Sequence, residues 1–242
     1  MKDNIGFRFQ LETKYQREPC SPGAIERQQK IEQTKVMTVD RIIKLPEPDC
    51  ENGGPLWKII NQRRSRRDYH KRPVSLSSLS QILWAAQGIS LKTANFALRT
   101  TPSAGALYPI ELYVSIHRAE NLPPGIYKYL PLNHSLRIKS GGDFSGLLTD
   151  AALNQEFLAE ASFVLLLTAV FERTTWKYGA RGFRYIYLDA GHIIQNASLA
   201  AVSCGLGSCP VAAFFDDEIN ALLGVNPDRE SAVYLLAVGW PR

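Results

Sequence analysis

The sequence predicts an α+β domain in which a central mixed or antiparallel sheet is flanked by helices. Segments with strand patterns and segments with helical patterns alternate irregularly, whereas a doubly wound parallel sheet needs regular alternation. Two continuous apolar, β-prone runs, residues 162–171 and 232–241, are typical of buried strands. Residues 185–207 are rich in Ala and Ser and apolar over most of a helix circumference, which indicates a long helix buried on several sides.

The first 55 residues differ from the rest of the chain. They mix charged residues with little periodicity and end in a linker rich in Pro, Gly and Asn, residues 44–55. We therefore expect an N-terminal extension and linker over residues 1–55, followed by one domain over residues 56–242. Within the extension, residues 23–36 match a short amphipathic helix.

Two helices are expected around a strongly basic segment. The first, residues 55–65, leads into that segment, and its Pro suits a first helical position. The second lies within residues 73–90, where Ser75 or Ser77 can cap its start. Gly88 is expected to end this helix in the left-handed conformation.

The middle of the chain predicts a strand, a hairpin and a helix. Residues 111–117 alternate between apolar and polar side chains, as in a strand. Residues 125–141 form two β-prone runs separated by a short turn, which indicates a hairpin. Residues 145–161 follow a helical pattern.

Composition excludes several classes of protein. The chain has 242 residues, of which 45% are hydrophobic, but no run approaches the roughly 18 apolar residues of a membrane span. The first residues lack the apolar core of a secretory signal, so we expect a soluble cytoplasmic protein. The four cysteines, at positions 20, 50, 204 and 209, are too few and too scattered for a disulfide framework, and we expect no metal site.

The net charge of +5 is concentrated in one place. Residues 61–73 hold six Lys and Arg and one Asp, so the remainder of the chain is neutral. A nucleic-acid-binding protein usually spreads its charge along a face, so this segment favours a single phosphate-bearing ligand. If the segment is extended, Arg63, Ser65 and Arg67 share one face and offer two guanidiniums and a hydroxyl to a phosphate. A solvated basic patch is the alternative.

Two further segments are rich in small residues. Residues 100–109 contain Pro102, Ser103, Ala104 and Gly105, which leave room for a flat ligand against the backbone, although an ordinary tight loop has the same composition. Residues 203–211 combine two glycines with a helix end. Taken alone, that combination indicates only a helix stop followed by a turn.

In this order, the motifs resemble those of the nitroreductase family of flavoproteins, and most closely its SagB-type azoline dehydrogenase branch. The likeness covers about residues 56–240. It is carried by the segments RRSRRDYHKRPVSLSSLSQILWAAQGI, TTPSAGALYPIELYV, PPGIYKYLPLNHSLRI and KYGARGFRYIYLDAGHIIQNASLAAVSCGLGSCPV. Several long motifs in series are more specific than any single glycine pattern.

The resemblance implies an intertwined homodimer with FMN at the subunit interface. By motif position, the phosphate and ribityl chain would be held by Arg63, Arg64, Ser65 and Arg67. The isoalloxazine would be lined, from the other subunit, by Pro102, Ser103, Ala104 and Gly105. The pyrimidine and N5 side of the ring would lie by Gly205, Leu206 and Gly207.

The resemblance also implies a catalytic pair. Lys177 and Tyr178 match the lysine and tyrosine with which azoline dehydrogenases abstract a proton. A lysine removed from water has a lowered pKa and can act as a base, and Arg173 and Arg181 would lower it further if they are close. The alternatives are that Lys177 is a surface cation, or that the pair is structural in relatives that do not act on azolines.

Three functions remain open on the sequence. The first is an FMN-dependent dehydrogenase that transfers a hydride between flavin N5 and a small organic or azoline substrate. The second is an NAD(P)H-dependent reductase of nitro, quinone or enone compounds, with NAD(P)H as a transient donor. The third is a non-catalytic basic binding module. Many nitroreductases continue to a basic residue that reaches the phosphate, and the sequence does not decide whether Arg242 takes that place.

Overall fold

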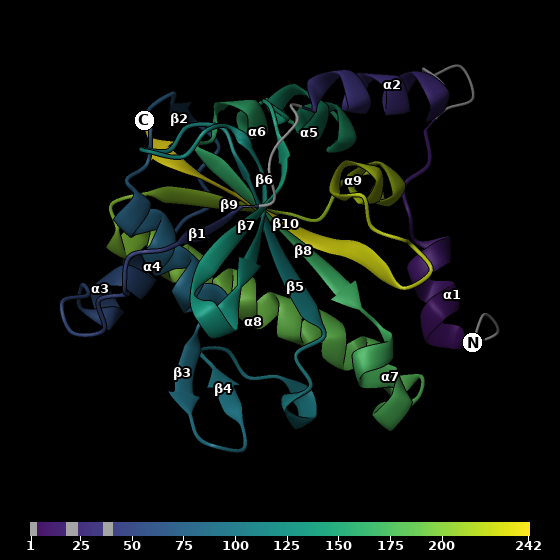
Figure 1. Ribbon diagram of the computed structural model, residues 1–242, viewed down its shortest axis with the longest axis horizontal. Coiled ribbons are helices and arrows are strands. Elements are labelled where there is room, and N and C mark those ends of the chain that lie inside the picture. Colours follow the sequence, from purple (N-terminus) through teal and green to yellow (C-terminus); the bar gives the residue numbers. More distant parts are fainter. Residues whose placement is uncertain (1–3, 18–23, 36–40) are drawn as a thin grey trace.

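The computed structural model describes residues 4–17, 24–35 and 41–242, and it is built around one eight-stranded sheet (Figure 1). The strands are β1 (Ile42–Lys44), β2 (Tyr69–His70), β5 (Ile110–Ile116), β6 (Gly125–Leu130), β7 (Ser135–Gly141), β8 (Phe163–Val170), β9 (Gly207–Val211) and β10 (Glu230–Pro241). Their order is β1-β7-β6-β5-β8-β10-β2, and β9 also pairs with β10. These pairings are all antiparallel within the described residues, and the predicted α+β class is confirmed.

The centre of the sheet is buried on both faces, which explains the continuous apolar runs in the sequence. Along β8, Leu165 and Leu167 join the core on one face, whereas Val164 and Leu166 join the core on the other. Successive strand residues point to opposite faces, so a strand covered on both sides is apolar at most of its positions, and its buried polar residues, such as Thr168, form hydrogen bonds. The predicted strands at residues 162–171 and 232–241 are confirmed.

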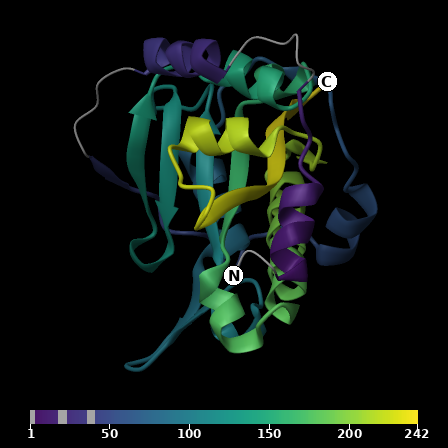
Figure 2. The ribbon, with the colours of Figure 1, turned by 90° about the vertical axis from the view of Figure 1, so that its right-hand side faces the viewer.

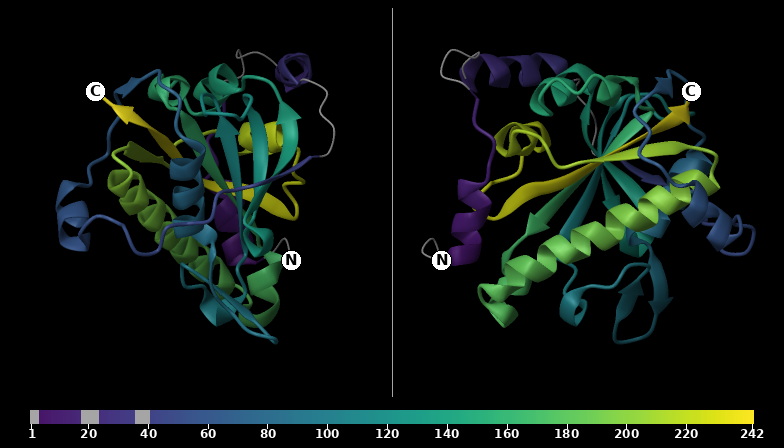
Figure 3. Two further views of the ribbon diagram at one scale, coloured as in Figure 1. Left: turned by 60° about the vertical axis from the view of Figure 1, so that its left-hand side comes forward. Right: turned by 180° about the vertical axis from the view of Figure 1, so that it is seen from behind.

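Helices cover both faces of the sheet (Figures 1 and 3). They are α1 (Ile5–Glu12), α2 (Ala24–Thr34), α3 (Leu56–Gln62), α4 (Leu76–Gln87), α5 (Ser145–Ala151), α6 (Phe157–Glu160), α7 (Glu172–Tyr178), α8 (Arg181–Ser203) and α9 (Asp216–Leu223). α4 and α8 pack on one face, and α5, α6 and α9 contribute to the core on the other. The predicted long helix is α8, but it begins at Arg181 and ends at Ser203, so the last predicted helical residues instead form the turn into β9. No helix among the described residues could cross a membrane.

The start of α4 is predicted correctly, but its end is not. Ser75 is the N-cap, and its Oγ accepts a hydrogen bond from the backbone N–H of Ser78 over 3.1 Å. Gly88 follows the helix with φ −64° and ψ 166°, so the expected left-handed conformation is wrong. A Cβ at this position would lie 2.1 Å from the Trp84 ring, so the glycine makes room for that ring while the chain enters the next strand.

The helical pattern of residues 145–161 is interrupted in the structure. α5 ends at Ala151 and α6 begins at Phe157, with left-handed Leu153 and Asn154 between them. The side-chain amide of Gln155 donates to the carbonyls of Ala152 and Ala213, over 2.8 and 2.9 Å. A contact with a segment far along the chain therefore holds the break, and a local pattern does not contain that information.

The N-terminal extension packs against the rest of the molecule. α1 lies on α8, where Gly6 is so close to the Phe183 ring that a Cβ would lie 2.4 Å from it. Ile31 of α2 is buried in the core beside α5 and α9, and β1 pairs with β7. The helix predicted over residues 23–36 is observed as α2, while positions 23 and 36, like Cys20, lie outside the described residues.

Two hairpins connect these elements. The predicted hairpin is β6–β7, joined by the short helix η2 (Pro131–Asn133) and by His134 with φ 43°. A separate two-stranded arm, β3 (Ile89–Lys92) and β4 (Ala97–Arg99), projects from the domain (Figure 2). This arm leads directly into the loop that contains Pro102.

Candidate functional site

The residues predicted from the sequence form two groups, one at each end of α8. The basic segment and the glycine turn meet at its C-terminal end, and the small-residue loop meets Lys177 and Tyr178 at its N-terminal end. Figure 3 shows α8 running the length of the domain between α7 and the turn into β9.

The basic segment is docked on the turn after α8. Its residues leave α3 in an extended conformation, and Ser65 forms a parallel bridge with Ser208. The backbone N–H of Arg66 donates to the Ser208 carbonyl over 2.9 Å. A Cβ on Gly207 would lie 3.0 Å from the side chain of Arg66, so glycine permits this close contact. The structure therefore brings the residues predicted to bind a phosphate into contact with the glycine turn.

The guanidiniums of this segment lack carboxylate partners among the described residues. The residues concerned are Arg63, Arg64, Arg66 and Arg67, of which the last three are exposed. Arg64 donates only to backbone carbonyls, those of Asn61 and of Arg63, over 2.9 and 2.7 Å. The acidic residue nearby, Asp68, pairs instead with Arg242 over 3.2 Å. The segment thus keeps a concentrated positive charge with which an anion can interact.

Tyr69 anchors the basic segment to the core. Its ring is completely buried, and its hydroxyl donates to the Arg66 carbonyl over 2.5 Å. Burial raises the pKa of the Tyr69 hydroxyl, which therefore stays protonated and remains a donor. The backbone of the segment is fixed while its charged side chains remain at the surface.

The turn after α8 is a Schellman motif. Gly205 has φ 73°, and its N–H donates to the Val202 carbonyl, while the N–H of Leu206 donates to the Ala201 carbonyl. The Leu206 side chain is buried in the core, so a ligand at this turn would meet the backbone of residues 205–207 rather than that side chain.

At the other end of α8, the small-residue loop lies against the predicted catalytic pair. A Cβ on Gly105 would lie 2.7 Å from the Tyr178 hydroxyl and 3.1 Å from Lys177 Nζ. Gly105, Ala106 and Tyr108 all have positive φ, of 63°, 53° and 48°. For Ala106 and Tyr108, which carry a Cβ, this conformation is strained, and such strain persists only where the surroundings impose it and is concentrated at functional sites.

Arg173 and Glu111 hold the end of this loop. Arg173 Nη1 donates to the Tyr108 carbonyl over 3.2 Å, and its Nη2 lies 2.5 Å from Glu111. Burial alone would raise the pKa of Glu111, but the charges of Lys128 and Arg173 hold it below its usual range. The sequence predicts that the charge of Arg173 favours the neutral form of Lys177. In the structure, Arg173 pairs with Glu111, so this charge is largely compensated. Lys177 itself is exposed in the single chain.

Two residues that contact the predicted site were not selected from the sequence. Arg66 contacts Gly207, although only its neighbours in the basic segment were chosen. Asp189 accepts a hydrogen bond from Ser103 Oγ over 2.6 Å. A signal for Asp189 was available, because it is the one carboxylate within the apolar run of residues 185–207.

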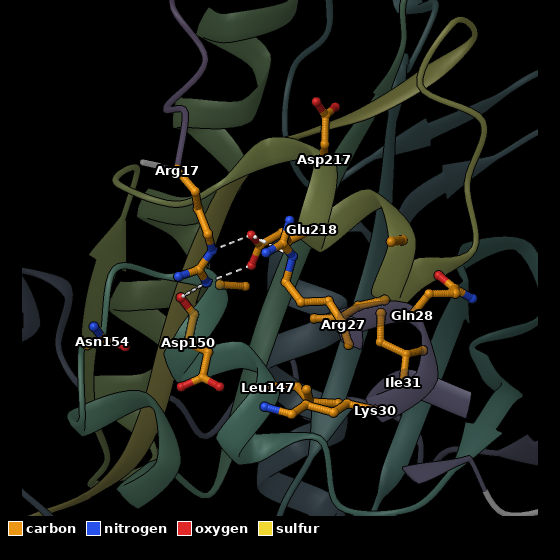
Figure 4. A pocket seen from close by; sticks show the side chains of 13 residues that line it. Arg17, Arg27, Gln28, Lys30, Ile31, Leu147, Asp150, Asn154, Asp217 and Glu218 are labelled. Carbon is orange, nitrogen blue, oxygen red and sulfur yellow. Dashed lines mark hydrogen bonds and ion pairs between the residues drawn. The ribbon is translucent and has the colours of Figure 1, made fainter. Parts of the chain in front are cut away.

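A pocket of about 390 Å³ lies elsewhere, between α2, α5 and α9 (Figure 4). Arg17 forms a bidentate contact with Glu218 at 2.5 and 2.9 Å, and Arg27 reaches the same carboxylate at 3.2 Å. These ion pairs join the N-terminal extension to α9. No residue predicted for the site lines this pocket.

Substitution of Gly105 with Ala should destabilise the protein. The left-handed conformation costs a residue with a Cβ about 1 kcal/mol, and the new methyl group must displace the ends of Tyr178 and Lys177. Denaturant unfolding should show a free-energy loss of about 1–2 kcal/mol. Gly146→Ala is the matched control, because its Cβ would meet no atom within 4 Å. Equal stability of the two variants would contradict this interpretation of the loop.

Comparison with known proteins gives a consistent result. The sequence model of the nitroreductase family matches residues 60–240. A candidate nitroreductase of Methanocaldococcus jannaschii is 42% identical over 192 residues, which make up 79% of this chain and 93% of that protein. The microcin B17-processing protein McbC of Escherichia coli is 30% identical over 172 residues, 64% of this chain and 58% of McbC, so the chain spans little more than half of McbC.

Solved structures share the fold. The crystal structure of a candidate nitroreductase from Ralstonia eutropha matches with a TM-score of 0.74 at 28% identity, over 86% of this chain and 93% of that one. A candidate nitroreductase from Desulfovibrio desulfuricans, solved in complex with FMN, matches with a TM-score of 0.55 at 21% identity, over 78% of this chain and 87% of that one. At this identity the second likeness concerns the fold alone.

Proposed function

Because this chain belongs to the nitroreductase family, we propose that it is an FMN-dependent oxidoreductase of the SagB-type branch. The observation that carries the proposal is the docking of an uncompensated basic segment on the glycine turn after α8. This arrangement offers guanidinium donors and backbone N–H groups to a phosphate in one place. The FMN bound by the D. desulfuricans structure supports the choice of ligand.

The residues present fit both parts of FMN. Arg63, Arg64, Ser65 and Arg67 would hold the phosphate and the ribityl chain. Pro102, Ser103, Ala104 and Gly105 form a half-exposed to exposed surface of small side chains that the isoalloxazine can cover. The backbone of residues 205–207 would meet the pyrimidine and N5 side of the ring.

We infer that the site is completed by a second copy of the chain. Ser103 contacts Asp189, which lies 14 residues before the end of α8 at Ser203, or about 21 Å along the helix axis, so the loop and the basic segment of one chain meet different parts of α8. In a two-fold symmetric dimer, the phosphate group of one copy can face the ring group of the other. Exposed apolar side chains beside α8 support this interface, namely Leu56, Trp57 and Ile60 of α3 and Leu188 of α8 itself.

When bound, FMN supplies the hydride chemistry, and the protein supplies orientation and proton transfer. Lys177 and Tyr178 lie beside Gly105, so they would face a substrate stacked on the ring. Lys177 would take the proton that leaves with the hydride in a dehydrogenation, and a second copy over α7 would remove Lys177 from water.

The likeness to a microcin-processing protein favours dehydrogenation of an azoline or similar ring over reduction of nitro compounds. NAD(P)H-driven reduction of nitro, quinone or enone compounds is the alternative, and the name of the M. jannaschii relative favours it. Anaerobic mixing of the enzyme with NADH, NADPH and an azoline peptide in turn distinguishes the two, because only a true donor bleaches the flavin absorbance.

The proposed function predicts a yellow, dimeric protein. Purified protein should show the visible absorption bands of flavin and release FMN on denaturation. Size-exclusion chromatography with light scattering should give twice the mass of the chain. A colourless protein that binds nucleic acid with steep salt dependence would contradict the proposal and favour a basic binding module.

A further inference from the structure

Asp189 is a buried carboxylate in the middle of α8, and its hydrogen bonds go to the small-residue loop. It is 5% exposed, and its Oδ2 accepts a hydrogen bond from Ser103 Oγ over 2.6 Å. The backbone N–H of Ala104 acts on the same carboxylate and lowers its pKa. Among the described residues it forms no ion pair with Lys or Arg. His192, three residues further along α8, also favours the charged form of Asp189. A buried carboxylate without a salt bridge depends on hydrogen bonds to offset the cost of burial, and here the loop supplies the hydrogen bond.

Through Ser103, Asp189 links the two ends of the loop. Ser103 Oγ donates to Asp189 and accepts a hydrogen bond from the backbone N–H of Tyr108 over 3.0 Å. Gly105 and Ala106, both with positive φ, lie between these ends, and Gly105 is in contact range of Lys177 and Tyr178. Burial raises the pKa of Asp189 above its usual range. The interactions with Ser103 and Ala104 favour the charged form and offset only part of this rise.

We propose that Asp189 is a positioning residue that, through Ser103, fixes residues 103–108 in the conformation that receives the isoalloxazine. This inference rests on the proposed function, because it assigns a role toward the flavin. The same hydrogen bonds set how the flavin-lining backbone lies relative to Lys177 and Tyr178. Arg173 donates a hydrogen bond to the Tyr108 carbonyl, and Asp189 accepts one from Ser103, so the loop is held at both ends.

The test uses three variants and one control in the full-length protein. Asp189→Asn replaces one carboxylate oxygen with a donor that faces other donors, and Ser103→Ala removes the connecting hydroxyl. Ser103→Thr restores that hydroxyl at a position whose φ of −140° suits a β-branched residue. Ser198→Ala is the control, because Ser198 is equally buried on α8 but its Oγ donates within the helix to Ile194.

We expect Asp189→Asn and Ser103→Ala to weaken FMN binding by a factor of about ten, because FMN binding must then order a loop that the parental protein already holds in place. Both should also shift the flavin midpoint potential and the shape of its visible bands. Ser103→Thr should restore the parental dissociation constant and spectrum, and Ser198→Ala should change neither. FMN fluorescence titration, spectroelectrochemistry and thermal unfolding measure these effects separately.

Unchanged FMN affinity, potential and spectrum in Asp189→Asn and Ser103→Ala would overturn the inference and leave the proposed function intact. A parental protein that binds no FMN would instead refute the proposed function. If Asp189→Asn does not fold, Ser103→Ala and Ser103→Thr still decide the matter, because Ser103 is only half-buried. A lowered melting temperature without a change in the flavin signals would show that Asp189 stabilises the fold only, and would also overturn the inference.

Discussion

Replacing Arg64 and Arg67 together with Ala should give a folded protein that is purified almost free of FMN. Each charge-assisted hydrogen bond to a phosphate contributes about 1.5–3 kcal/mol. Loss of both guanidiniums should therefore weaken FMN binding by a factor of about 10² to 10⁴. The flavin to protein ratio of the purified variant, and its dissociation constant for added FMN, measure the effect. Both side chains are exposed, so the unfolding temperature should change little.

A matched control removes the same charge at another place. Lys44→Ala combined with Lys139→Ala deletes two exposed cations on β1 and β7, away from the glycine turn. This variant should retain FMN, which would show that the position of the charge matters rather than the net charge. Full flavin content in the Arg64 and Arg67 variant would refute the phosphate site.

The second large effect is expected at Lys177. Lys177→Ala should retain FMN but lose dehydrogenation by a factor of about 10² to 10⁴, the usual contribution of a positioned general base. Lys177→Arg keeps the positive charge but carries a side chain that does not release its proton in proteins, so it should be equally inactive. Single-turnover reduction of the bound flavin by an azoline substrate measures this step apart from reoxidation.

The role of the neighbouring tyrosine is tested by Tyr178→Phe, which removes only the hydroxyl beside Gly105. We expect slower dehydrogenation with unchanged FMN content. If Lys177→Ala reduces its flavin at the parental rate, the general-base assignment fails. If Lys177→Arg is active while Lys177→Ala is not, the lysine acts through its charge rather than as a base.

The elements of the core could be predicted because their signals are local. The apolar runs of β8 and β10 and the hairpin β6–β7 are encoded in the side chains of the elements themselves. The break between α5 and α6 could not be predicted, because it depends on the contact of Gln155 with the distant Ala213 carbonyl. The conformation of Gly88 likewise depends on where the Trp84 ring packs.

The site was predicted as a set of motifs, and the structure adds how they meet. The order of the motifs predicted that the basic segment and the glycine turn bind the same ligand. In the structure, the bridge between Ser65 and Ser208 brings the two segments into contact. Motif order could not reveal that the small-residue loop meets α8 at Asp189, well away from the glycine turn, because separation in space is not encoded in spacing along the chain. The position of Asp189 as the one carboxylate in an apolar run marked it as unusual, but its partner Ser103 lies 86 residues away and could not be read from the sequence.

The central claim is that each flavin is held by two copies of the chain, and mixed dimers test it most directly. One copy carries Arg64→Ala and Arg67→Ala, and the other carries Ala104→Trp, which fills the surface proposed for the ring. Tandem affinity tags isolate the mixed dimer. Each variant alone should bind no FMN, whereas the mixed dimer should bind about one FMN per dimer, because one of its two composite sites is intact. Mixed dimers that bind no FMN would show that each site lies within one chain and would contradict the account.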